Sequence, residues 1–317
     1  AISDTSAVEY DTYTMDGGSG ADTISVALSS IGGYVNNNDL SVGGGAGNDS
    51  IDVALVGSTI YSNTVDVDGG DGTDTVSVLL SATYTDISDN AVSVEGGGGA
   101  DTISVTISAT GSNVSTNSVS IDGGTGADTL SLALAARDYV YNVTAAMNGG
   151  TGSAGDVLSL TAFGSEISQN DVTLAGGGGD DALSVALTGT YSVESNTVSM
   201  DGGDGTDTLS LSLAVTGGGY YIDDNTLSMA GGGGNDALTL TAFGSEVYSN
   251  DVTMTGGTGI DTLTVAMTGT YSLEYNTVTV DAGSGADTVD VSLFGGWYLY
   301  SNAVDIDAGL GNDTVSV

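Results

Sequence analysis

One nonapeptide pattern, G-G-x-G-x-D-x-U-x with U an apolar residue, returns twelve times along this chain of 317 residues. It first reads GGSGADTIS, from Gly17 to Ser25, and it last reads AGLGNDTVS, ending at Ser316. A fixed period of 25 to 29 residues along the whole chain predicts a solenoid in which each repeat makes one coil. The aspartates of the pattern are Asp22, Asp49, Asp74, Asp101, Asp128, Asp156, Asp181, Asp207, Asp236, Asp261, Asp287 and Asp313.

Apolar and polar residues alternate on both sides of each glycine turn. After the turn comes a run such as Ile24-Ser25-Val26-Ala27-Leu28, and before it a shorter run such as Val65-Asp66-Val67. Period two with one apolar side predicts a strand with one buried face. The sequence has no convincing helical periodicity, so we expect an all-β fold: a right-handed parallel β-solenoid of about 12 coils of about 26 residues.

An asparagine recurs before the shorter run, and we expect it to form the second corner of each coil. Asn tolerates the left-handed region, and aligned Asn side chains of stacked coils can hydrogen-bond to one another as a ladder. The first repeat has Asp11 at this position. The other members of the column are Asn38, Asn63, Asn90, Asn117, Asn142, Asn170, Asn196, Asn225, Asn250, Asn276 and Asn302.

A longer period groups the coils. TAFGSEISQNDVT at Thr161 returns as TAFGSEVYSNDVT at Thr241, 80 residues later. We therefore expect residues 1–317 to form one continuous solenoid of four units, each of three coils and about 79 residues.

The charge is one-sided, with 41 acidic residues against a single base, Arg137. A net charge of −40 argues against nucleic acid and anionic membranes as partners, and it opposes compaction unless counter-ions bind. No apolar run reaches the about 18 residues of a membrane-spanning helix, so we do not expect insertion into a membrane. The chain lacks Cys, His and Lys, which removes disulfides, thiol–zinc sites and nearly every nucleophile–base pair, so we do not expect an enzyme.

The nonapeptide resembles the calcium-binding repeat of the RTX (repeats-in-toxin) family, and the resemblance covers the whole chain. It implies that glycine turns stack with Ca²⁺ between them, held by the side chains of the twelve pattern aspartates and by backbone carbonyls of turn residues such as Gly17, Ser19, Gly44 and Ala46. Calcium suits such a site because it accepts six to eight oxygens in loose geometry. The resemblance also implies export from the cell.

Two departures from the family pattern change the expected site. The family carries a turn motif on both sides of a shorter coil, whereas this chain has one per coil, so we expect one column of about 11 ions and a metal-free edge at the asparagines. The turn from Gly149 is two residues longer before Asp156, which is expected to distort the adjoining sites. Acids just before the glycines are either extra ligands or solvated surface: Asp16, Asp68, Glu95, Asp122, Asp201, Asp281 and Asp307.

Two surface rows leave alternatives open. Most of the 15 tyrosines, with Phe163, Phe243 and Trp297, cluster near the asparagine corner, where they either cap the core or form an aromatic edge for lateral contacts with a fibre or ligand. A row of threonines beside the pattern aspartates suggests ice binding, but Ser50, Val157, Ala182 and Ala237 interrupt it.

The chain begins partway through a coil and stops in the strand after a turn, without a polar cap. From this we expect either head-to-tail stacking of copies into a filament or a slice of a longer repetitive protein. The combined expectation is a calcium-stabilised extracellular structural protein that forms a rod or filament at the cell surface or in a matrix. The alternatives are an ice-binding protein and an adhesin stalk segment of a giant secreted RTX protein.

Overall fold

The computed structural model describes residues 2–4, 7–217 and 220–317. The fold is the predicted one, an all-β parallel solenoid of about 12 coils about 26 residues apart, and no described residue lies in a helix. The described residues accordingly include no helix suited to crossing a membrane. Contacts divide the chain into unit 1, Ala1–Thr151 with Asp156–Gly164, and unit 2, Gly152–Gly155 with Ser165–Val317. The predicted grouping of coils in threes stays a prediction.

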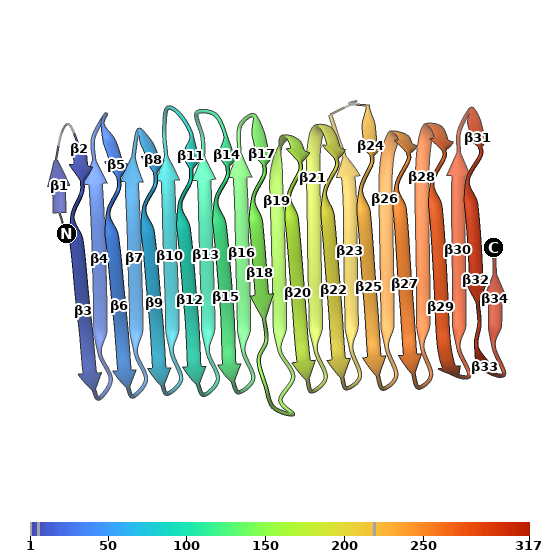
Figure 1. The fold of residues 1–317 in the computed structure, drawn as a ribbon, viewed down its shortest axis with the longest axis horizontal. Helices are drawn as coiled ribbons and strands as arrows, with labels where there is room; N and C mark the ends of the chain where they lie inside the picture. The colour runs from blue at the N-terminus through green and yellow to red at the C-terminus, as the bar shows by residue number, and fades with distance from the viewer. Residues whose placement is uncertain (1, 5–6, 218–219) are drawn as a thin grey trace. The chain divides into compact units, whose positions relative to one another are not determined.

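Each coil of unit 1 runs along one sheet, passes a short strand at one edge, and returns along a second sheet to the glycine turn at the other edge (Figure 1). The strands that enter the glycine turns are β3 Thr12–Ser19, β6 Asp39–Ala46, β9 Thr64–Asp71, β12 Ala91–Gly98, β15 Ser118–Thr125 and β18 Thr144–Asn148. The strands that leave the turns are β4 Thr23–Ser30, β7 Ser50–Gly57, β10 Thr75–Ala82, β13 Thr102–Ala109, β16 Thr129–Ala136 and the first part of β19 Val157–Ser168, with β1 Ile2–Asp4 beside β4. The short strands are β2 Ala7–Glu9, β5 Tyr34–Asn36, β8 Thr59–Tyr61, β11 Ile87–Ser88, β14 Val114–Ser115 and β17 Tyr139–Tyr141.

Unit 2 repeats this plan, although in several coils the leaving strand and the short strand merge into one. The strands that enter the turns are β20 Asp171–Gly178, β22 Thr197–Asp204, β25 Thr226–Gly233, β27 Asp251–Thr258, β29 Thr277–Gly285 and β32 Ala303–Asp307, followed by β33 Leu310–Gly311. The strands that leave the turns are β21 Ala182–Glu194, β23 Thr208–Val215, β26 Ala237–Tyr248, β28 Thr262–Glu274, β30 Thr288–Gly295 and β34 Thr314–Ser316. The last part of β19 takes the place of a short strand. The separate short strands are β24 Tyr221–Asp223 and β31 Tyr298–Tyr300.

Successive coils pair in parallel and in register, which stacks like side chains inside each unit. In β7, Ile51 and Leu55 pair with Val76 and Leu80 of β10, and all four side chains are at most 1% exposed. The alternation seen in the sequence therefore separates an inner apolar face from an outer polar face. Each fully buried Leu, Ile or Val stabilises the fold by roughly 1.5–3 kcal/mol relative to an exposed one.

The second corner of each coil has a left-handed residue, but in all coils except one it is not the predicted asparagine. Ser62 has φ of 55° and is followed by Asn63, and Ser249 with φ of 54° is followed by Asn250. The expectation that Asn itself takes the left-handed conformation was therefore wrong at every coil except that of Asn142. The asparagine comes one residue later because its side chain is needed inside the coil.

The column predicted to include Asn142 is also corrected at that coil. Asn142 is the left-handed residue, with φ of 52°, and its side chain is exposed. The pairing of Ser115 with Tyr141 and of Ser118 with Thr144 places Val143 opposite Asn117, and Val143 is 1% exposed. An apolar residue thus takes the inner corner position in this one coil.

Candidate metal site in the glycine turns

The glycine turns stack so closely that side chains are excluded from them. In the second turn, Gly45 and Gly47 have φ of 101° and 127°, a region that glycine alone enters freely. A Cβ atom on Gly45 would overlap the carbonyl oxygen of Gly18 in the preceding turn. Without these Cβ atoms, the N–H of Gly20 donates to the carbonyl of Ala46 at 2.6 Å.

The pattern aspartates end the turns and point into each unit. Asp22 and Asp313 are half-buried, and the ten aspartates between them are at most 3% exposed. Buried carboxylates are rare in proteins unless they are paired or bind a metal. This column is therefore the strongest functional candidate in the chain.

One oxygen of each carboxylate joins a ladder along the turns. The Oδ1 of Asp49 accepts the backbone N–H of Asp22 at 2.7 Å, and the Oδ1 of Asp74 accepts that of Asp49 at the same distance. In unit 2, the Oδ1 of Asp236 accepts the N–H of Asp207 at 2.8 Å. The ladder holds each side chain in one orientation and leaves the second oxygen pointing elsewhere.

The second oxygen of most of these carboxylates is buried and has no hydrogen-bond partner. This holds for the Oδ2 atoms of Asp22, Asp49, Asp74, Asp101, Asp128, Asp207, Asp236, Asp261 and Asp287. Leaving a buried charged oxygen unsatisfied is costly, more so than for a neutral group. Nine such atoms in equivalent positions indicate that a proton or a bound cation neutralises these carboxylates in the stable folded state.

A backbone carbonyl lies near eight of these nine oxygens. A Cβ built on Gly44 would lie 2.6 Å from the Oδ2 of Asp49 and 2.5 Å from the carbonyl oxygen of Gly69, so these two oxygens are at most 2.6 + 2.5 = 5.1 Å apart. The same arrangement recurs in both units. The pairs are Asp22 with Gly44, Asp74 with Gly96, Asp101 with Gly123, Asp128 with Gly149, Asp207 with Gly231, Asp236 with Gly256 and Asp261 with Ala282.

Burial raises the pKa of seven of the pattern aspartates, so these seven hold protons more tightly when no cation is near. It raises the pKa of Asp101 to about 6, and the neighbouring carboxylates of Asp128 and Asp74 add to the rise, while the hydrogen bond from Asp74 opposes it. Burial likewise raises the pKa of six other members of the column: Asp74, Asp128, Asp156, Asp207, Asp236 and Asp261. At neutral pH, ionisation of these carboxylates therefore lowers the stability of the cation-free fold.

The donor set fits a hard cation. Carboxylate and carbonyl oxygens are the ligands that Ca²⁺ takes in proteins, with flexible geometry. No three His, Cys, Asp or Glu side chains in the described ranges gather into a metal-binding group. A cation here would therefore take one carboxylate from a turn and draw most of its shell from backbone carbonyls and water.

The four carbonyls singled out from the sequence differ in their surroundings. The carbonyl of Gly44 lies beside the Oδ2 of Asp22, as a shared ligand would. The carbonyl of Ala46 accepts the N–H of Gly20, which leaves one lone pair for a cation. Gly17 and Ser19 belong to the first turn, where Gly17 is half-buried and Ser19 is exposed. The equivalent carbonyls in the other turns belong to the first residue of each nonapeptide, and they were not identified from the sequence. Their fixed position, usually five residues before the pattern aspartate, could have identified them.

The acids just before the glycines lie on the other face of the sheet. A Cβ built on Gly69 would point toward the Oδ2 of Asp74, inside the coil. Because successive side chains of a strand point to opposite faces, Asp68 points outward. Asp68 and Glu95 are paired in register and exposed. Asp122 accepts the N–H of Gly124 at 3.1 Å. These acids are thus separated from the buried oxygens.

The long turn keeps its link to the preceding coil. The Oδ1 of Asp156 accepts the N–H of Asp128 at 2.7 Å, and the carbonyl of Gly149 lies beside the Oδ2 of Asp128 as in the other coils. The extra residues fall in 152–155, which are grouped with unit 2. The turn itself differs from the others, because β18 ends at Asn148, before the glycines, whereas β15 continues through its glycines to Thr125. The expected distortion of the adjoining sites stays a prediction.

The aromatic rings form an exposed edge and do not cap the core. Tyr84, Tyr191 and Tyr300 are 73%, 48% and 58% exposed, and Trp297 is 79% exposed. Within each unit the rings meet edge to face across coils, as Tyr34 and Tyr61 do at 6.2 Å between centroids. The outer surface near the asparagine corner is therefore aromatic.

Comparison with known proteins finds no matching family model, no matching curated protein and no matching solved structure. We therefore infer the function from the geometry of the turns and from their charge.

Proposed function

We propose that this protein is a calcium-stabilised structural solenoid of the RTX type that works outside the cell. The observation that carries the proposal is the column of buried Asp Oδ2 atoms that have no hydrogen-bond partner, eight of them near a backbone carbonyl of the next turn. A bound divalent cation supplies the missing positive charge to these oxygens. The chain's own part is to hold the carboxylates in register through the Oδ1 ladder and to exclude side chains from the turns through glycine.

The net charge of −40 supports a folding switch driven by calcium. Where calcium is scarce, repulsion along the column opposes stacking of the turns. Where calcium is millimolar, as outside cells, each ion that binds only the folded state adds to the free energy of unfolding. The chain would then stay unfolded in the cytosol and fold after export.

Assembly into a rod or filament is the second part of the proposal. Successive coils inside each unit are joined by parallel backbone pairing with full register, as between β10 and β13. The same pairing between copies would add coils without new chemistry. Adhesin stalk, matrix fibre and surface layer are the roles compatible with such a rod.

The test is a calcium titration of protein freed of divalent ions, followed by circular dichroism, calorimetry and electron microscopy. We expect β signal to appear with calcium, with about 11 ions bound per chain, one for each space between the twelve turns. Magnesium at equal concentration should be much less effective, because it demands tighter geometry and gives up water reluctantly. Unchanged β signal in excess chelator at neutral pH would contradict the proposal.

A second candidate function rests on the threonine row. In unit 1, Thr23, Thr75, Thr102 and Thr129 are exposed and lie in one column, interrupted by Ser50. The neighbouring outward column contains Ser25, Asp52 and Ser77, so the threonines do not repeat across the sheet. We rank ice binding second for this reason, and the absence of thermal hysteresis in calcium would dismiss it.

A further inference from the structure

Strands β26, β28 and β31 of unit 2 present two columns of side chains on one outer face, near the corner opposite the glycine turns. Each column mixes acids with aromatic rings in register. The first column is Glu246, Ser272 and Tyr298, and the second is Tyr248, Glu274 and Tyr300. The residues between them along β26 and β28, Val247 and Leu273, are fully buried and point inward.

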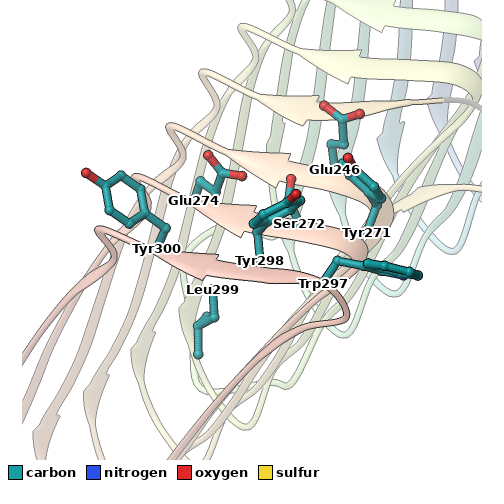
Figure 2. A pocket seen from close by; sticks show the side chains of 8 residues that line it. All are labelled: Glu246, Tyr271, Ser272, Glu274, Trp297, Tyr298, Leu299 and Tyr300. Atoms are coloured by element: carbon teal, nitrogen blue, oxygen red, sulfur yellow. The ribbon is translucent and has the colours of Figure 1, made fainter.

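All residues of these columns except Tyr248 line a hollow of about 600 Å³ (Figure 2). Glu246, Ser272, Glu274 and Tyr298 lie on the same side of the strands in this view, and Tyr271 and Trp297 close one end. Ser272 is 4% exposed and forms part of the floor. The rings of Tyr271 and Tyr298 meet edge to face at 5.5 Å between centroids, which fixes one wall.

Tyr300 lies at the end of the hollow opposite Trp297 (Figure 2). Its ring meets that of Tyr275, which with Tyr248 and Glu274 lines a smaller adjoining hollow, edge to face at 5.5 Å. Glu274 lies between Tyr248 and Tyr300 in its column, so an aromatic ring flanks its carboxylate on either side, one strand spacing away. The hollow is therefore an aromatic box with two carboxylates.

The charge in the box selects the sign of its ligand. The chain's single base, Arg137, belongs to unit 1 and lies beside Asp138, so unit 2 contains no basic residue. The negative charge of Glu246 raises the pKa of Tyr221, its neighbour in the first column, with burial a smaller cause. An anionic ligand is disfavoured by these acids and by the net charge of −40.

We propose that this box binds an organic ammonium cation, seated against the rings of Tyr271, Trp297 and Tyr298 and neutralised by Glu246 and Glu274. The faces of aromatic rings attract cations, and quaternary ammonium groups are the ligands typically recognised in this way. Nearby carboxylates add to this attraction. A hydrated metal ion gains little from the rings. A neutral sugar would use the rings but not the charges.

The test uses Trp297, the only tryptophan of the chain, as a reporter inside the site. Its fluorescence is followed while tetramethylammonium chloride is added to folded protein in fixed excess calcium, with sodium chloride at equal ionic strength as the reference. We expect a saturable change with tetramethylammonium and none with sodium. Tyr298→Ala should weaken binding by roughly 2- to 5-fold, the range for an exposed cation–π contact of about 0.5–1 kcal/mol. Glu274→Gln should weaken binding as well, because it removes one of the two negative charges that face the cation.

The matched control is Tyr84→Ala, an exposed tyrosine of unit 1, which should leave the affinity unchanged. Circular dichroism checks that each variant is folded, and Glu246→Gln replaces Glu274→Gln if the latter is not. A linear response equal to that of sodium would overturn the proposal. So would unchanged affinity in the glutamine variants, or saturation by a neutral oligosaccharide with none by tetramethylammonium.

Discussion

The two edges of each coil carry ladders that are alike in geometry and opposite in chemistry. At the corner edge, the Oδ1 of Asn63 accepts the N–H and the Nδ2 of Asn38, and its own Nδ2 donates to Asn90 at 2.9 Å. At the turn edge, the Oδ1 of Asp49 accepts the N–H of Asp22, but its Oδ2 has no hydrogen-bond partner. The two side chains differ by one group, NH₂ against O⁻.

This difference decides whether an edge closes by itself. An amide offers both a donor and acceptors, so a stack of Asn side chains can satisfy its members without any other species. A carboxylate offers only acceptors, so a stack of Asp side chains cannot. We infer that the corner edge is a permanent joint and the turn edge is a conditional one, which closes when a cation or a proton arrives.

The largest expected effect comes from pH in calcium-free protein. In the folded state the pKa of Asp101 is raised from 3.8 to about 6, so the folded chain binds more protons than the unfolded chain between these values. Stability should therefore be greatest below pH 4, fall as the pH rises from about 4 to about 6, and stay low above. Thermal melts by circular dichroism at several pH values, with and without calcium, measure this. If the calcium-free protein were equally stable at pH 4 and pH 7, the aspartate edge would not need a proton or a cation to close, and the two edges would not differ as inferred.

The next effect comes from making the corner edge resemble the turn edge. In Asn90→Asp, a carboxylate oxygen replaces the Nδ2 that donates to Asn117 at 2.9 Å and to the carbonyl of Ser88 at 2.9 Å. It would face these acceptors without a partner, and we expect a loss of about 3–5 kcal/mol, as for other unpaired buried charges. Asn142→Asp is the control, because Asn142 is exposed and outside the ladder, and it should change stability by less than about 0.5 kcal/mol. Equal effects of the two substitutions in urea unfolding would contradict the ladder.

The converse substitution, Asp101→Asn, should have a smaller effect whose sign depends on calcium. Without calcium, the new amide removes a buried charge and brings a donor close to the carbonyl of Gly123, so we expect a gain of about 1–3 kcal/mol. With calcium, the variant loses a carboxylate ligand and should be less stable than the native chain. The midpoints of urea unfolding, measured with and without calcium, give the sign of the change in stability. A change of the same sign in both would show that Asp101 does not hold a cation.

The smallest expected effect concerns how the corner turns. Ser62 adopts φ of 55° and its side chain is exposed, so its left-handed conformation is a cost without a gain in packing. Ser62→Gly should therefore stabilise the protein by up to about 1 kcal/mol, in calcium and without it alike. A destabilisation measured by thermal melting would mean that the Ser62 side chain contributes to the corner.

Much of this architecture can be predicted because the same pattern of glycine, aspartate and alternating apolar residues occurs twelve times. The alternation around Ile51 and Val65 gives the strands and their buried faces, and the fixed spacing of Asp and Asn gives the two ladders. The error at Asn142 arose because residue spacing was followed without the strand register. The run Thr144-Ala145-Ala146-Met147 places its apolar residues as Ser118-Val119-Ser120-Ile121 does, which fixes Val143 at the ladder position.

The state of the second carboxylate oxygen could not be predicted, because it depends on how the coils stack. Sequence identifies Asp49 as a candidate ligand but does not say that its Oδ1 is already taken by Asp22. The aromatic box was also missed. Glu246 and Glu274 have no motif of their own, and they acquire meaning only when the register places them beside Ser272, Tyr248 and Tyr300.

The most direct test of the central claim is a crystal structure of the protein grown in calcium, with anomalous scattering used to locate the ions. We predict a single column of calcium ions along the turn edge, each bound to the Oδ2 of a pattern aspartate such as Asp101 and to backbone carbonyls of the turns, and none along the asparagine corner. A turn edge without ions and with the same unpartnered Oδ2 atoms, or ions only at outer acids such as Asp68, would contradict it.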